Sequence, residues 1–189
     1  DSIAHYLRAN HWTVHTLTDE DATKTNWIRF LSEEKPSLLH LATHGYYSAA
    51  PSEVAMPSTF KQNAYETAED PLFRSGLLFT GCNYIWAGDA PIDMIDDGVL
   101  SAYEASNLDL SNLELLVLSA CLTGLGDVQG NEGVFGLQRA FRLAGAKRMI
   151  VSLREVFDED TFELMKTFYE IWDKESNPQP AFRKALITM

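Results

Sequence analysis

The segment LELLVLSAC, from Leu113 to Cys121, carries four consecutive aliphatic residues followed by small ones. A strand whose residues are apolar without alternation is covered on both faces, as in a parallel sheet between helices. Shorter runs of the same kind occur at Leu38 to Ala42 and at Lys147 to Leu153. Helix-like patterns separate these runs, so the sequence predicts an α/β layer fold.

Working outward from this segment, apolar spacing predicts the remaining elements. Val134, Leu137, Phe141 and Ala144 recur at helical spacing, and Gly145 follows as a residue suited to end a helix. Long polar loops are expected at residues 48–71 and 87–98. The other expected helices cover residues 3–9, 22–32 and 162–172 and a stretch after Pro180, and the other expected strands are Thr13 to Leu17 and Ser75 to Thr80.

Composition limits the kind of partner. The chain has 189 residues and a formal net charge of −12, so direct binding to nucleic acid or to an anionic membrane is not expected. Two cysteines are too few for a disulfide scaffold, and no apolar run reaches the length of a membrane span. We therefore expect free thiols, a cytoplasmic location and a single domain over residues 1–189. Because the sequence starts at Asp1 without a Met, we expect a fragment of a longer chain.

Two of the predicted strands run into residues that can carry chemistry. The run from Leu38 leads to His44, and the run from Leu115 leads to Cys121. If these strands are parallel, both side chains emerge at one edge of the sheet, where ligands bind in open α/β folds. A thiol nucleophile needs a nearby imidazole to move protons. The alternative is that Cys121 is a packing residue and His44 a structural or surface residue.

Four segments taken together resemble the CHAT domain family, caspase-like proteins that are often fused to TPR repeats. They occur in the order expected for that family and span nearly the whole chain. The segments are LHLATHGY (39–46), GVLSAYE (98–104), VLSACLTGLG (117–126) and GVFGLQRAF (133–141).

The resemblance implies a caspase-hemoglobinase-like three-layer sandwich, in which helices flank a mostly parallel central sheet. It also implies a cysteine endopeptidase with Cys121 as nucleophile and His44 as general acid and base. The tetrahedral intermediate then needs hydrogen-bond donors for its oxyanion, and the backbone N–H groups of Gly45 and Cys121 are the candidates. No cofactor and no metal are expected. The chain departs from the family pattern at Leu122 and at Arg154, where an acidic residue and a Trp are common.

A substrate preference can be read from the segment after the last predicted strand. By analogy with separase-like relatives, Asp158 is expected to bind a basic residue at P1, with Asp160 as a neighbouring alternative. Both residues also suit the N-terminus of a helix, where carboxylates cap free N–H groups. The two roles can coexist.

The remaining candidates for a functional role are a stretch of acidic residues, a second cysteine and a second histidine. From Ser75 to Gln138 there are nine acidic residues and no Lys or Arg, a distribution that would steer a basic peptide or serve only as solvated loop charge. Cys82 is expected to be a core residue. His40 lies four residues before His44 on the same strand face, and packing or a supporting role is expected for it.

Three functions follow, in order of preference. The first is a regulated endopeptidase that acts on a protein or peptide substrate. The second is a pseudo-protease or interaction module with an idle dyad, and the third is a small-molecule thiol hydrolase with a closed pocket. The resemblance further implies upstream TPR repeats or a regulatory subunit, and a place in bacterial signalling or defence.

Overall fold

The chain divides into two compact units in the computed structural model. The structure describes residues 2–48, 72–87, 96–119, 132–152, 158–175 and 177–189. One unit, here called the terminal unit, combines residues 1–16 with residues 156–189. The other, here called the sheet unit, comprises residues 17–155. That residues 1–189 act as a single domain stays a prediction.

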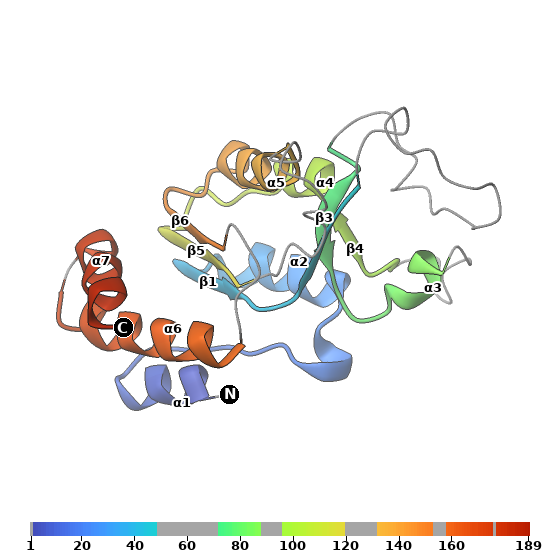
Figure 1. Ribbon diagram of the computed structural model, residues 1–189. Coiled ribbons are helices and arrows are strands. Elements are labelled where there is room, and N and C mark those ends of the chain that lie inside the picture. Colours follow the sequence, from blue (N-terminus) through green and yellow to red (C-terminus); the bar gives the residue numbers. More distant parts are fainter. Residues whose placement is uncertain (1, 49–71, 88–95, 120–131, 153–157, 176) are drawn as a thin grey trace. The chain divides into compact units, whose positions relative to one another are not determined.

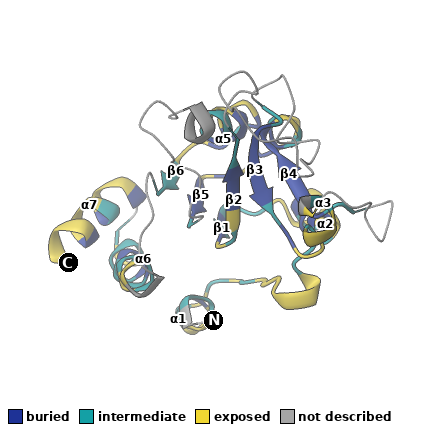
Figure 2. Ribbon diagram, turned by 45° about the vertical axis from the view of Figure 1, so that its right-hand side comes forward, coloured by how far each residue is buried: buried dark blue, intermediate teal, exposed yellow. Residues whose placement is uncertain are grey.

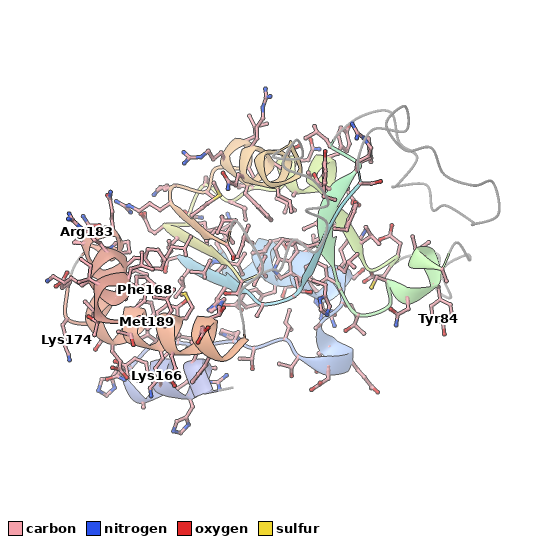
Figure 3. All side chains as sticks on the ribbon, in the orientation of Figure 1. Tyr84, Lys166, Phe168, Lys174, Arg183 and Met189 are labelled. Atoms are coloured by element: carbon pink, nitrogen blue, oxygen red, sulfur yellow. The ribbon has the colours of Figure 1, made fainter. Side chains whose placement is uncertain are left out.

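The terminal unit consists of three helices with an aromatic core. On α6 the side chain of Phe168, labelled in Figure 3, is fully buried, and its ring meets that of Phe182 edge-on with the centroids 5.6 Å apart. The last helix begins at Pro178, which takes the first helical position. The Asn177 side chain caps this helix by accepting a hydrogen bond from the backbone N–H of Gln179. The helices of this unit are α1 (Ser2–Ala9), α6 (Asp158–Trp172) and α7 (Pro178–Thr188).

The strand predicted at Thr13 to Leu17 is wrong, because residues 12–18 have no regular secondary structure. The guanidinium of Arg8 donates to the carbonyl oxygen of Val14 at 3.1 Å, which ties this segment back to α1. An alternating pattern of five residues without a neighbouring strand to complete its hydrogen bonds does not form a sheet.

The sheet unit is built around a three-stranded parallel sheet, sheet A, in the order β1-β5-β6. All four residues of the central strand are buried, as its uninterrupted aliphatic run predicts. Figure 2 shows this strand in the colour of buried residues. In register, Leu41 lies beside Leu118, which lies beside Val151. The strands are β1 (Leu38–Leu41), β5 (Leu115–Leu118) and β6 (Met149–Val151).

Side chains alternate between the two faces of sheet A. Leu39, Leu41, Leu116 and Leu118 join the main core of the unit together with residues from three helices. Two of these helices, α4 and α5, contact each other and lie side by side in Figure 1. Gly145 follows α5 with a φ of 109°, which is the left-handed helix ending that the sequence predicts. The helices are α2 (Lys24–Glu34), α4 (Ala102–Ser106) and α5 (Glu132–Leu143).

A second sheet of three antiparallel strands, sheet B, follows the order β2-β3-β4. Only the middle strand is predicted from sequence, because the residues of the outer two, HGYY and VLS, form no run of three large apolar residues like LLF at 77–79. Gly76 is required there, since a Cβ at this position would lie 2.3 Å from the carbonyl oxygen of Leu100. The strands are β2 (His44–Tyr47), β3 (Ser75–Leu78) and β4 (Val99–Ser101).

Two short helical segments complete the sheet unit, a 3-10 helix at Asp19–Asp21 and α3 at Asn83–Trp86. Tyr84 of α3 is exposed and labelled in Figure 3. The predicted fold class is confirmed: the chain is an α/β protein whose parallel sheet is flanked by helices, an arrangement compatible with a caspase-like sandwich.

Candidate functional site

The carboxyl ends of β1 and β5 meet at one edge of sheet A. The strands are parallel, and the backbone N–H of Ser119 donates to the carbonyl oxygen of Leu41 at 2.9 Å just beyond the paired residues. His44 follows Leu41 by three residues, and Cys121 follows Leu118 by three residues. Each is therefore within about 10 Å along the chain of the paired strand ends. The parallel pairing on which the prediction depends is confirmed, while Cys121 lies outside the described residues.

His44 is the first residue of β2, and its side chain is exposed. Its backbone is opposite Leu78 of β3. The hydroxyl of the preceding residue, Thr43, donates a hydrogen bond to the carbonyl oxygen of Leu78. The main chain at His44 is therefore fixed by sheet pairing, and its side chain is open to solvent.

The backbone N–H of Gly45 points away from β3. The N–H of Ser48 donates to the carbonyl oxygen of Arg74 at 2.7 Å, so these two residues form a hydrogen-bonded pair. Hydrogen-bonded pairs alternate along an antiparallel ladder, so the next bonded positions on β2 are Tyr46 and His44. Gly45 lies between them, and β2 is the first strand in the order of sheet B. Its N–H thus faces the edge of the strand that β3 does not occupy.

His40 and Ser119 form a polar contact beside these strand ends. The Nε2 atom of His40 lies 3.0 Å from the hydroxyl oxygen of Ser119. Burial lowers the pKa of His40 to about 4, so its ring is neutral at physiological pH. This residue supplies hydrogen bonding rather than positive charge, in line with the supporting role expected from the sequence.

The two candidate specificity residues belong to the terminal unit. Helix α6 begins at Asp158, so this residue occupies a helix N-terminus, as the alternative interpretation from sequence requires. Asp160 follows in the same turn and is exposed. The side chain of Asp158 lies outside the described side chains, and a role of either residue in substrate binding stays a prediction.

Cys82 is partly buried rather than a full core residue, and it directly precedes α3. Burial raises the pKa of its thiol, which lowers the fraction of reactive thiolate. Neither feature favours Cys82 as a nucleophile.

Several of the acidic residues that lie near the candidate nucleophile in the sequence are paired in the structure. Asp97 and Glu104 both contact the amino group of Lys24, at 2.5 and 3.1 Å. Glu114 pairs with Lys147 and precedes β5, at the opposite end of that strand from Ser119. These three carboxylates therefore give little support to an acidic cleft.

Sequence reasoning missed Lys24, which is buried with 8% of its surface exposed. A signal was present, because Lys24, Trp27 and Leu31 recur at the helical spacing i, i+3, i+7 that marks the buried side of α2. Its amino group also donates to the carbonyl oxygen of Val99 at 2.9 Å. Burial acts to lower the pKa of Lys24, but hydrogen bonds and charge from Asp97 and Glu104 outweigh it and raise that pKa.

The described residues hold no cluster of three His, Cys, Asp or Glu side chains suited to bind a metal ion. Among the described helices, none is both long enough and apolar enough to cross a bilayer.

The family model described as the CHAT domain matches residues 1–189. No curated protein matches the chain.

Proposed function

The chain belongs to the CHAT domain family, which is caspase-like, and from this premise we propose that it is a cysteine endopeptidase that uses Cys121 and His44. The pairing of β1 with β5 carries this proposal. It brings Leu41 and Leu118 side by side in parallel, three residues before the proposed base and the proposed nucleophile. A dyad needs its two members at one sheet edge, and this register supplies that edge.

The chemistry proceeds through an acyl-enzyme. His44 takes the proton of the Cys121 thiol, and the sulfur attacks the carbonyl carbon of the scissile peptide bond while the carbonyl electrons move to oxygen. Collapse of this tetrahedral intermediate expels the amine, which receives the proton from His44. Water then attacks the thioester with His44 as base, and the released sulfur regains its proton.

Backbone donors stabilise the negative oxygen of each tetrahedral intermediate. The N–H of Gly45 is one such donor, because the ladder of sheet B leaves it unused by β3. The N–H of Cys121 is the second. Preorganised donors of this kind contribute about 3 kcal/mol each to lowering the barrier.

We assign a protein or peptide substrate to this site, with a basic residue at P1. Upstream TPR repeats or a regulatory subunit would control access, in a cytoplasmic signalling or defence assembly. Family membership supports a peptide substrate, and the acidic residues at the start of α6 support a basic residue at P1.

Selective labelling of the two cysteines tests whether the dyad is active. A peptide carrying a thiol-directed electrophile should modify Cys121 and leave Cys82 unmodified, because burial raises the pKa of the Cys82 thiol. Mass spectrometry of the digested protein would locate the adduct. The Cys82→Ser variant, which retains Cys121, should be labelled at the wild-type rate.

Equal labelling of both cysteines by this reagent would count against an activated nucleophile. Absence of any adduct at Cys121, even with native partners added, would favour the pseudo-protease function instead.

The P1 preference is tested by comparing Asp158→Asn with Asp160→Asn. Asparagine matches aspartate in size and still offers a side-chain oxygen to a helix N-terminus, so the first substitution removes only the charge. If Asp158 binds the P1 residue, kcat/KM for peptides with P1 Arg should fall about 10–100-fold in Asp158→Asn, because a hydrogen bond to a charged group contributes roughly 1.5–3 kcal/mol. Asp160→Asn should leave the profile unchanged. A peptide library cleaved without basic preference at P1, or with the same preference in Asp158→Asn, would remove Asp158 from the pocket.

A further inference from the structure

His40 and Ser119 lie on the same face of sheet A. His40 is in register with Val117 of β5, and neighbouring residues of paired strands point to the same face. Ser119 follows Val117 by two residues and therefore continues on that face. On this face Leu115 and Val117 are only 2% and 1% exposed, and His40 itself is half-buried. A histidine among such residues is a polar group placed in apolar surroundings.

Ser119 is held by β1 in two ways. Its backbone N–H donates to the carbonyl oxygen of Leu41 at 2.9 Å, and its hydroxyl lies 3.0 Å from Nε2 of His40. The first bond continues the parallel ladder by one residue beyond the strand. The second holds the side chain of Ser119, the last described residue before Cys121.

We propose that His40 is a positioning residue: through Ser119 it fixes the backbone that leads into the nucleophile. This inference rests on the proposed function, in which Cys121 is that nucleophile. Cys121 follows Ser119 by two residues, so its Cα lies within about 7 Å of the Cα of Ser119. Both the sulfur and the N–H that Cys121 offers to the oxyanion depend on this backbone.

The chemistry of the ring suits this role. A neutral imidazole offers one donor and one acceptor and brings no charge that would compete with His44 for the thiolate. The pKa of His40, lowered to about 4 by burial, keeps the ring in that state at physiological pH. Because a displacement of about 1 Å can cost roughly 100-fold in rate, a hydrogen bond two residues from the nucleophile can change kcat without touching substrate.

A double-mutant cycle tests the inference on catalysis. His40→Ala and Ser119→Ala should each lower kcat about 10–100-fold with KM changed less than about twofold, because positioning acts on the reacting geometry. The double variant should lose no more than the worse single variant, since both remove the same hydrogen bond. Ser119→Thr, which keeps the hydroxyl, should retain kcat within a few-fold of wild type. His5→Ala, a change at an exposed histidine of α1, serves as the control.

Amide hydrogen exchange gives a second reading that does not depend on cleavage. Because the N–H of Ser119 is bonded to Leu41, its exchange should accelerate at least about tenfold in His40→Ala, while amides of α5 keep their wild-type rates. If wild type neither cleaves nor is labelled but this acceleration is seen, the proposed function fails and the positioning contact stands. Unchanged kcat in an active His40→Ala protein, losses that multiply in the double variant, or unchanged exchange at Ser119 would each overturn the inference.

Discussion

Replacing Cys121 by alanine is expected to abolish peptide cleavage, and replacing His44 by alanine is expected to lower kcat/KM by about 10³–10⁴-fold. The first change removes the atom that forms the acyl bond. The second leaves the thiol without a partner to accept its proton and without an acid for the leaving amine. Initial rates on a fluorogenic peptide, measured with purified protein, would give both values.

The controls follow from burial. The side chain of His44 is exposed, so His44→Ala should unfold within about 2 °C of wild type. The double variant Cys121→Ala/His44→Ala should be no less active than Cys121→Ala alone, because the two residues act as a unit. Cleavage retained by a purified Cys121→Ala sample would exclude the proposed mechanism, and full activity in His44→Ala would exclude this histidine as the base.

Helices and strands could be predicted where their own residues form an aliphatic run or a helical spacing. The aliphatic run of β5 and the amphipathic spacing of α5 ending at Gly145 are local features, and the structure confirms both. The two outer strands of sheet B, β2 and β4, could not be predicted in the same way, because they lack such a run and are defined by their pairing with β3. Gly76 illustrates this, since its need for a small residue comes from Leu100, 24 positions away.

The candidate site, too, could be predicted only where a local motif marks its residues. The sequence motifs identify His44 and Gly45 as candidates. Their proximity to Cys121 requires β1 and β5 to be parallel neighbours, and the structure confirms that pairing. Sequence motifs do not reveal polar contacts between segments that are far apart in the chain. The contact of His40 with Ser119 joins residues 79 positions apart, and Lys24 meets Asp97 across 73 positions. Charge counted along the sequence therefore overstated the acidity available to a substrate.

The Lys24 contacts form an ionic cluster around a buried amino group, and this cluster ties three elements together. Lys24 lies near the start of α2, Asp97 precedes β4, and Glu104 belongs to the capping box of α4, where it also accepts from the backbone of Ser101. Asp96 adds a bond to the backbone N–H of Thr25 at 2.8 Å. The lysine amino group is thus the common partner of two carboxylates and one carbonyl.

Lys24→Met is expected to lower the free energy of unfolding by about 2–4 kcal/mol, because it preserves the apolar stem but leaves two carboxylates without their cation. The loss should fall below that of a fully enclosed pair, since the side chain of Glu104 is 39% exposed and water can solvate it. Lys147→Met provides the matched control: its pair with Glu114 has both side chains about half exposed, so a much smaller change than in Lys24→Met is expected. Urea denaturation followed by tryptophan fluorescence would measure both. Equal losses in the two variants would mean that the Lys24 cluster contributes no more than a surface ion pair, and the link between α2, β4 and α4 would have to come from apolar packing alone.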